Sequence, residues 1–149
     1  MGISRFNNEG YVDLTPYKAI MSVESKKKPR FPFHPMVYIC SPFAGDVETN
    51  IDNARRYSRF AVEQGYLPIT PHLLYPQFLD DDSQHERDIG LFFGLILLDK
   101  CSEVWVFGDY ISEGMKAEIR RAQLKIISLK YFNTNCQIRY KLNRIVANK

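Results

Sequence analysis

Two short, strongly apolar segments constrain the fold of this chain more than any other feature. They are Met36–Cys40 (MVYIC) and 103–108 (EVWVFG), and each is followed by a turn and then by a segment with helical periodicity. Apolar runs of this length without polar alternation are typical of strands that are buried on both faces. The sequence therefore predicts parallel strands that alternate with covering helices.

The segments after these strands predict two helices. Apolar residues recur at helical spacing from 47 to 62, with Asp46 as a suitable N-cap and Gly65 as the stop. Ser112 is the expected N-cap of a second helix, which runs to Gln123. Both helices thus begin close to the carboxyl end of a predicted strand.

A third helix is expected to begin after Ser83, which forms a capping-box pattern with Glu86. Residues 89–98 of this helix are apolar nearly all round. That distribution predicts burial against the sheet and is compatible with further burial against another subunit.

Weaker patterns complete the predicted sheet. Residues 66–70 form a strand whose Pro68 suits an edge position, and 125–129 form a final strand. A longer connection spans 71–82, and a basic terminal helix is expected over 137–146. We therefore expect an α/β fold, a flavodoxin- or Rossmann-like three-layer sandwich with a mostly parallel sheet of four to five strands. Ligands of such folds bind beyond the carboxyl ends of the strands.

The sequence divides into three parts. Its 149 residues are 45% hydrophobic, which suffices for one globular domain with a core. Residues 1–35 are interpreted as an N-terminal arm with a basic cluster and a short helix over 14–23, and 36–130 hold the domain. Residues 131–149 are expected to form a basic C-terminal tail or helix.

Charge and cysteine content exclude several classes of protein. A net charge of +3 with 25% charged residues is not typical of a protein that binds a nucleic-acid polymer. The longest apolar run, 89–98, is too short to cross a bilayer, so no membrane association is expected. Three cysteines with no pair at metal or redox spacing predict a reducing, cytoplasmic setting, and neither a metal nor a cofactor is expected.

The start of the helix after 103–108 carries the clearest chemical motif. A helix N-terminus offers unpaired N–H groups and a partial positive charge, and the Ser112 hydroxyl adds a donor for an anion. Glu118 lies one turn after Gly114 on the same helix face, so its carboxylate leans over a position without a side chain. Met115 belongs to the same candidate binding turn. A carboxylate there suits attack on a sugar carbon, whereas the alternative is a capped surface helix.

The loop after the first strand is a second candidate binding element. Its backbone N–H groups from Ser41 through Ala44 to Gly45 are placed to hold a phosphate or ribose hydroxyls, and Phe43 is placed to stack on a base. The loop has neither the G-x-G-x-x-G pattern nor a Walker motif, which argues against a dinucleotide oxidoreductase and a P-loop kinase.

The acidic segment 80–88 is a third candidate. It is interpreted either as a divalent metal site or as a solvated helix start whose negative charge matches the helix dipole. The three histidines have no ligand spacing among themselves, although His72 follows a strand end and is placed to line a pocket.

Four stretches occur in a specific order along the chain: YICSPFAGD, GYLPITPHLLYPQFLDD, HERDIGLFFG and LLDKCSEVWVFGDYISEGMKAEI. Together they resemble the nucleoside 2-deoxyribosyltransferase-like superfamily, and more narrowly its small phage and bacterial branch, a domain of unknown function. The resemblance covers about residues 36–129. It implies an enzyme that cleaves the N-glycosidic bond of nucleosides or nucleotides through a glutamate nucleophile and passes the sugar to another base or to water.

The resemblance also implies roles for individual residues. Glu118 matches the nucleophile, and Tyr38 matches a tyrosine that helps to orient it. Ser112 matches a phosphate-contacting serine of the branch that hydrolyses deoxynucleoside 5′-monophosphates, whereas nucleoside transferases tend to carry an acidic residue there. Because a hydroxyl accommodates phosphate where a carboxylate repels it, the expected substrate is a nucleotide.

A further acidic residue near the leaving base is implied by the same resemblance. Asp88 is the nearest candidate, with Glu86 or Arg87 as alternatives because the helix register is open. Members of the superfamily are usually dimers or higher oligomers whose pockets borrow a residue from the neighbouring subunit. A homo-oligomer is therefore expected.

Three functions remain open at this point. The first is an enzyme that cleaves N-glycosidic bonds through Glu118. The second is a non-catalytic binding module for a nucleotide or a nucleotide-derived signal, serving phage or host defence. The third is an oligomeric interaction protein that assembles through 89–98 and its basic tail.

Overall fold

The computed structural model describes residues 32–142 of the chain. The predicted helix over 14–23 lies outside the described residues, and the division into arm, domain and tail stays a prediction. Along the chain the elements are β1 (Met36–Cys40), α2 (Val47–Glu63), β2 (Leu67–Ile69), α3 (Pro71–Leu74), a 3-10 turn (Tyr75–Gln77), α4 (Gln84–Leu98), β3 (Glu103–Phe107), α5 (Glu113–Leu124), β4 (Ser128–Phe132) and β5 (Ile138–Leu142).

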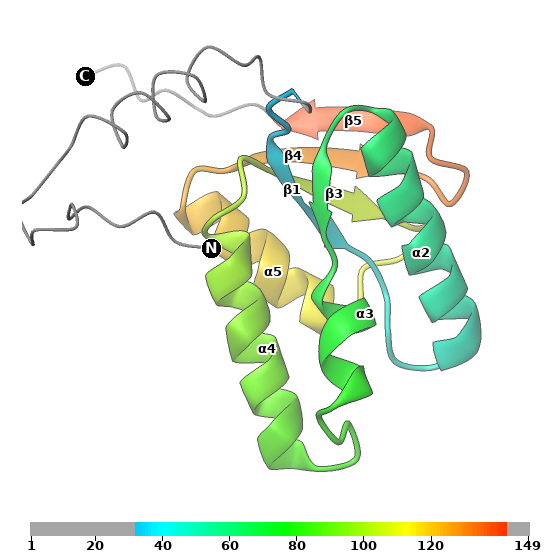
Figure 1. Cartoon of the computed structure of the whole chain (residues 1–149), viewed down its shortest axis with the longest axis vertical. Coiled ribbons are helices and arrows are strands. Elements are labelled where there is room, and N and C mark those ends of the chain that lie inside the picture. The colour runs from blue at the N-terminus through cyan, green and yellow to red at the C-terminus, as the bar shows by residue number, and fades with distance from the viewer. Residues whose placement is uncertain (1–31, 143–149) are drawn as a thin grey trace, which may run out of the picture. The chain divides into compact units, whose positions relative to one another are not determined.

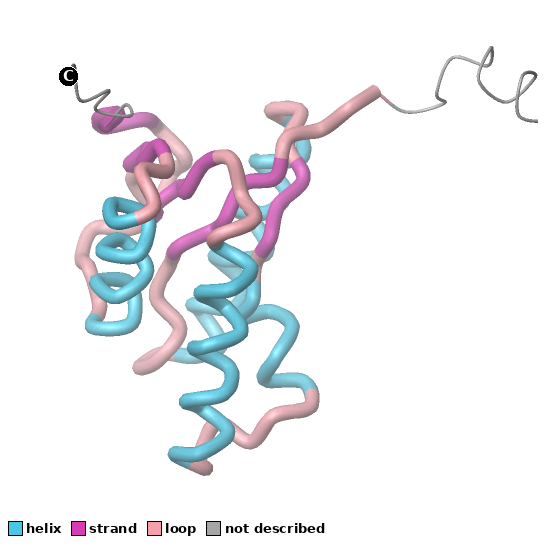
Figure 2. Tube along the Cα trace, turned by 90° about the vertical axis from the view of Figure 1, so that its left-hand side faces the viewer, coloured by secondary structure: helices cyan, strands magenta, loops and turns pink. Residues whose placement is uncertain are grey.

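The sheet has five strands in the order β2-β1-β3-β4-β5. The first four are parallel, and β5 pairs antiparallel with β4. Figure 1 shows α2 on one side of the sheet and α4 and α5 on the other. In Figure 2, which is turned by 90°, α4 and α5 lie in front of the strands and α2 lies behind them. The predicted three-layer α/β sandwich is therefore confirmed.

Local sequence signals account for most of the element boundaries. The Asp46 side chain accepts a hydrogen bond from the Thr49 N–H at the start of α2. After α2, Gly65 has a φ of 84°, a left-handed conformation that favours glycine. Pro68 lies on β2, which is an edge strand as its proline predicts. These caps and stops fix where the chain turns back along the sheet.

An aromatic cluster holds α2 against the sheet. Phe107 is fully buried between Tyr57 and Phe132, with ring centroids 4.2 Å and 4.9 Å away and nearly parallel planes. Trp105 contacts Phe132 on the same face, with a centroid distance of 5.1 Å. This cluster is one of two halves of the core, and the other half packs under α4 and α5.

The end of the described chain differs from the sequence-based expectation. The last parallel strand is Ser128–Phe132, three residues later than predicted. The predicted basic helix over 137–146 is wrong, because β5 occupies Ile138–Leu142. Apolar and basic residues alternate there with the period of a strand, and the ring of Tyr140 stacks on that of Tyr131 at 4.3 Å. Pairing to β4 thus outweighs the weak helical pattern.

The predicted burial of α4 against the sheet is limited to a few positions. Only Gly94 and Leu98 of this helix are buried. The exposed large apolar side chains on α4 are Leu91, Phe92, Phe93 and Ile96. The helix therefore packs through a narrow stripe, and the expected contact of its apolar residues with another subunit stays a prediction.

No helix within residues 32–142 is both long enough and apolar enough to cross a membrane.

We expect Phe107→Ala to lower the free energy of unfolding by about 3–5 kcal/mol, because it removes the ring at the centre of the aromatic cluster and leaves a cavity. Urea denaturation followed by circular dichroism measures the change. Leu124→Ala is the matched control, since Leu124 is 73% exposed and its removal should change stability by no more than about 0.5 kcal/mol. Equal losses in the two variants would contradict the assignment of the cluster as core.

Candidate active site

A cavity of about 420 Å³ lies at the carboxyl ends of the strands, between the loop after β1, the α3 segment, α4 and the start of α5. Its lining residues are Tyr38, Ser41, Phe43, Ala44, Pro71, His72, Tyr75, Pro76, Leu79, Asp80, Asp81, Glu86, Arg87, Gly90, Leu91, Gly94, Ser112, Glu113, Gly114, Met115 and Glu118. Its position agrees with the rule that open parallel sheets bind ligands beyond the carboxyl ends of their strands.

A short hydrogen bond joins the two residues at the base of the cavity. The Tyr38 hydroxyl donates to Oε1 of Glu118 at 2.7 Å. Tyr38 is only 1% exposed, so the packing of β1 fixes the position of its ring. A Cβ atom on Gly94 would lie 3.1 Å from the Tyr38 oxygen, so this position on α4 must stay small for the two helices and β1 to meet here.

Burial raises the pKa of the Glu118 carboxyl, and the hydrogen bond from Tyr38 acts in the opposite direction. The pKa of Tyr38 is raised well above its usual value by burial and by the neighbouring carboxylate, so the tyrosine stays a hydrogen-bond donor. Glu118 is thus a carboxylate held on the edge of an apolar core with the Tyr38 hydroxyl directed at it. Perturbed carboxyl groups in cavities of this kind are frequent at active sites.

The first turn of α5 forms one wall of the cavity. The Ser112 hydroxyl oxygen accepts a hydrogen bond from the Met115 N–H at 3.3 Å and caps the helix. Met115 is buried beneath this turn, whereas a Cβ atom on Gly114 would meet nothing within 4 Å. The helix start therefore presents a hydroxyl and an open backbone surface next to Glu118.

The loop after β1 is held in place by Asn50, whose amide donates to the carbonyl oxygens of Phe43 and Ala44, both at 3.0 Å. Its Phe43 ring lies near His72, with centroids 6.3 Å apart. By contrast, Gly45 has a φ of 96° and does not line the cavity, so its place in the loop is to permit the turn.

A partly buried polar pair joins this loop to α3. Oγ of Ser41 and Nε2 of His72 are 2.9 Å apart. Burial lowers the pKa of His72 to about 4, so its imidazole is neutral at physiological pH. A neutral ring can donate from one nitrogen and accept at the other, which suits recognition of a polar, uncharged group.

The acidic segment before α4 closes the other side of the cavity. Glu86 lines it and accepts a hydrogen bond from the Asp80 N–H through Oε2, and the Arg87 guanidinium donates to the Asp81 carbonyl oxygen. Asp88 does not line the cavity and instead accepts a hydrogen bond from Gln84 at 2.8 Å. Across residues 32–142 no group of three or more His, Cys, Asp or Glu side chains could hold a metal ion.

The structure brings together nine of the residues singled out from the sequence: Tyr38, Ser41, Phe43, Ala44, His72, Ser112, Gly114, Met115 and Glu118. It does not bring Asp88 or Gly45 to the cavity. The sequence reasoning named His72 on α3 but missed the neighbouring wall residues Pro71, Tyr75 and Pro76, and it missed Gly90 and Gly94 on α4. Two glycines four residues apart on one helix face were a usable signal, because they mark a surface that another group approaches closely.

Residues 35–132 match the model of a protein family described as a domain of unknown function, DUF7768. The chain belongs to the DUF7768 family. The match spans all of the cavity-lining residues, so the candidate site lies within the DUF7768 domain.

Among solved structures, this DUF7768 protein is similar to a 2-deoxyribosyltransferase from the psychrotolerant bacterium Bacillus psychrosaccharolyticus. The TM-score is 0.56 at 14% sequence identity, and the alignment covers 70% of this chain and 77% of that chain. At this identity the likeness shows a shared fold. The predicted 2-deoxyribosyltransferase-like fold is thereby confirmed. A search of curated protein sequences finds no match.

The raised pKa of Glu118 predicts a stability effect with a definite sign. A carboxyl group whose pKa is higher in the folded state contributes stability while it is protonated, and this contribution is lost as the pH rises through the folded-state pKa. Glu118→Gln is neutral at every pH. We therefore expect it to have a higher Tm than the wild type at pH 7, with the difference shrinking as the pH is lowered to about 4.

Thermal unfolding across this pH range measures the difference. Glu63→Gln is the matched control, because Glu63 lies on α2 in an exposed ion pair with Arg59 and should show little change at any pH. A Glu118→Gln variant that is less stable than the wild type at pH 7 but not at acid pH would contradict the burial argument.

Proposed function

We propose that this protein cleaves the N-glycosidic bond of a nucleoside or, preferentially, of a nucleoside 5′-monophosphate, with Glu118 as the nucleophile. The observation that carries the proposal is the Glu118 carboxylate, which lines the cavity while the buried Tyr38 hydroxyl holds its Oε1 at 2.7 Å. This hydrogen bond fixes the carboxylate and leaves its other oxygen for attack. The likeness in fold to a 2-deoxyribosyltransferase supports the same chemistry.

In the proposed reaction a carboxylate oxygen of Glu118 forms a bond to C1′ of the sugar. The C1′–N bond to the base breaks, its electron pair stays on the base nitrogen, and a proton neutralises the leaving base. Water or a second base then attacks C1′ of the glycosyl ester, which releases the sugar and restores the Glu118 carboxylate. Water gives hydrolysis, whereas a second base gives transfer.

Glu86 is the best candidate for the group that faces the leaving base. It lines the cavity from the first turn of α4, whereas Asp88 points to Gln84 outside the cavity. Oε2 of Glu86 accepts a hydrogen bond from the Asp80 N–H. The contact with the leaving base is therefore assigned to the other carboxylate oxygen, Oε1. We therefore assign to Glu86 the interaction that the sequence resemblance placed near Asp88.

The start of α5 is suited to the phosphate of a nucleotide. The α5 N-terminus carries a partial positive charge, Ser112 adds a hydroxyl, and Gly114 leaves the backbone open. The neutral His72 on α3 offers a polar contact, and the Phe43 ring on the loop after β1 offers an aromatic surface. A sugar between these two walls reaches Glu118.

Incubation with a panel of nucleosides and their 5′-monophosphates, followed by chromatography for free base, tests the proposal. Base release is expected from at least one compound, with a loss on the order of 10³-fold or more in Glu118→Gln because the nucleophile is removed. Glu63→Gln, on the other side of the sheet, should retain wild-type release. No release from any compound, or equal release by Glu118→Gln, would refute glycosidic cleavage. A compound that raises the Tm but is recovered intact would favour a binding module instead.

Ser112→Asp tests the preference for a monophosphate. Aspartate is as good an N-cap as serine, so the helix should remain capped while a negative charge enters the phosphate position. We expect the KM for the preferred nucleoside 5′-monophosphate to rise about tenfold or more, and the KM for the matching nucleoside to stay nearly constant. Steady-state base release with both substrates gives the ratio, and an equal change for both would remove the phosphate assignment.

A further inference from the structure

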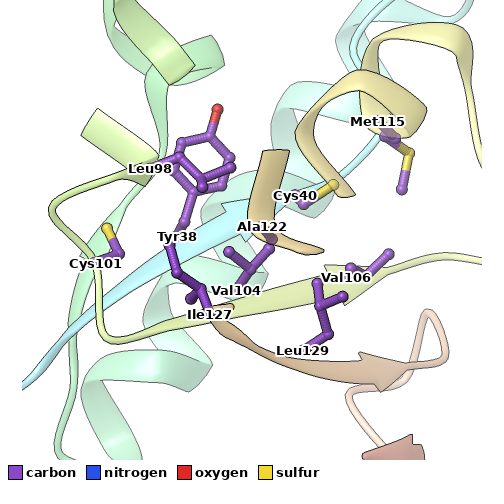
Figure 3. Packing of buried hydrophobic residues seen from close by; sticks show 10 residues of the cluster. All are labelled: Tyr38, Cys40, Leu98, Cys101, Val104, Val106, Met115, Ala122, Ile127 and Leu129. Carbon is purple, nitrogen blue, oxygen red and sulfur yellow. The ribbon is translucent and has the colours of Figure 1, made fainter. Parts of the chain in front are cut away.

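The Tyr38 hydroxyl lies between two helices. On one side it donates to Oε1 of Glu118 on α5 at 2.7 Å. On the other side is Gly94 of α4, where a Cβ atom would lie 3.1 Å from the Tyr38 oxygen. Figure 3 shows the Tyr38 side chain standing on β1, on the same side of the sheet as Leu98, with its hydroxyl at the end away from the strand. The hydroxyl thus has a hydrogen-bond partner on α5 and a close steric neighbour on α4.

The space at Gly94 is limited by the Tyr38 oxygen alone. A separation of 3.1 Å is shorter than the usual contact of a methyl carbon, so a side chain at this position requires a neighbour to move. The next nearest atoms, Cβ and Cγ of Pro71, would lie at 3.7 Å and 3.8 Å, which is ordinary van der Waals contact. The crowding therefore concerns one polar atom of the candidate site.

The α4 backbone has little freedom to withdraw from this atom. Four residues beyond Gly94, Leu98 is fully buried, and the next residue, Asp99, forms an ion pair with Arg121 of α5 at 2.6 Å. The backbone of Tyr38 is also fixed, because β1 pairs with β2 on one side and with β3 on the other. The tip of the Tyr38 side chain, by contrast, reaches the cavity and has space to shift. A methyl group at position 94 therefore displaces the hydroxyl and weakens its hydrogen bond.

We propose that Gly94 is a positioning residue for the candidate nucleophile. The absence of a side chain there sets where the Tyr38 hydroxyl lies and, through it, where the Glu118 carboxylate is held. Gly94 acts through Tyr38 in this role and not through contact with a substrate. The catalytic consequence rests on the proposed function, whereas the fit of the three residues is a property of the folded chain.

Gly90 provides an internal comparison on the same helix. It lies one turn before Gly94 and also lines the cavity. A Cβ atom there would meet Cδ1 of Leu79 at 3.6 Å and Cβ of Tyr75 at 3.9 Å, both ordinary contacts. Replacement by alanine gives a similar gain in helix propensity at the two positions, so a difference between the variants reports their surroundings. Of the two, only position 94 places the new methyl group against the Tyr38 oxygen.

The test is a carbon-13 NMR titration of the Glu118 side-chain carboxyl in the full-length protein, with the signal assigned by its loss in Glu118→Gln. We expect Gly94→Ala to move the titration midpoint upward by about half a pH unit or more, because the hydrogen bond from Tyr38 to the charged form is weakened. Gly90→Ala should leave the midpoint unchanged. Tyr38→Phe removes the donor and should raise the midpoint at least as far as Gly94→Ala does.

A double variant separates this role from a general packing defect. Without the tyrosine oxygen, a methyl group at position 94 meets only ordinary contacts. Gly94→Ala should therefore add no further shift of the midpoint in the Tyr38→Phe background, and there it should raise the Tm as much as Gly90→Ala does. In the wild-type background the gain in Tm from Gly94→Ala should be smaller than that from Gly90→Ala.

Two outcomes of the titration overturn the proposal. One is a Gly94→Ala midpoint equal to that of Gly90→Ala, and the other is a shift from Gly94→Ala that is as large in the Tyr38→Phe background as in the wild type. If Gly94→Ala alone does not fold, the double variant decides. A folded double variant supports the steric requirement, whereas an unfolded one beside a folded Tyr38→Phe overturns it.

The titration needs no substrate, so it can be read whether or not glycosidic cleavage occurs. Where base release is detected, the acid limb of its pH profile should move upward in Gly94→Ala together with the midpoint. A midpoint that moves while the acid limb does not would support the positioning of Glu118 by Gly94 and count against Glu118 as the nucleophile.

Discussion

The site depends on keeping one carboxylate at the edge of an apolar core. Burial penalises the charged form of Glu118, and only donors held in fixed positions offset that penalty. Strand β1 supplies such a donor in Tyr38. Its side chains alternate, so that Tyr38 packs in the cluster with α5 while Val37 and Ile39 pack in the cluster with α2. One strand of five residues thus anchors half of the core on each face and sets the orientation of the candidate nucleophile.

The order of the strands explains why the cavity forms where it does. Strand β1 lies between β2 and β3, so the chain leaves it toward one side of the sheet and later returns on the other. The connection through α2 covers one face, and the connection through α3 and α4 covers the opposite face. The crevice between these crossovers opens at the carboxyl edge. Residues distant in sequence, such as Ser41 and His72, meet there at 2.9 Å.

Sequence reasoning succeeded where the determining interaction is local, and it failed where the determining interaction is long-range. The caps at Asp46 and Ser112 and the face shared by Gly114 and Glu118 depend on a few consecutive residues, so the sequence was enough to predict them. The rotation of α4 depends on what Gly94 packs against, and a local pattern does not contain Tyr38 or Pro71. The sequence therefore left Asp88, Glu86 and Arg87 open, and of these Glu86 and Arg87 line the cavity. Likewise β5 is a strand because β4 offers an open edge.

Several features of the site reduce stability for the sake of geometry. Glycine inside a helix costs about 1 kcal/mol relative to alanine, yet α4 carries Gly90 and Gly94 on the face toward the cavity. A Cβ atom on Gly94 would lie 3.1 Å from the Tyr38 hydroxyl oxygen that donates to Glu118, so a small residue here leaves this hydrogen bond room. The charged form of Glu118 is itself unfavourable where it lies. These destabilising features lie on the side of the sheet covered by α4 and α5. On the other side, the stacked rings of Tyr57, Phe107 and Phe132 stabilise the folded state. Both faces of β1 therefore pack in the core, and the face toward α5 also holds the Glu118 carboxylate at the cavity.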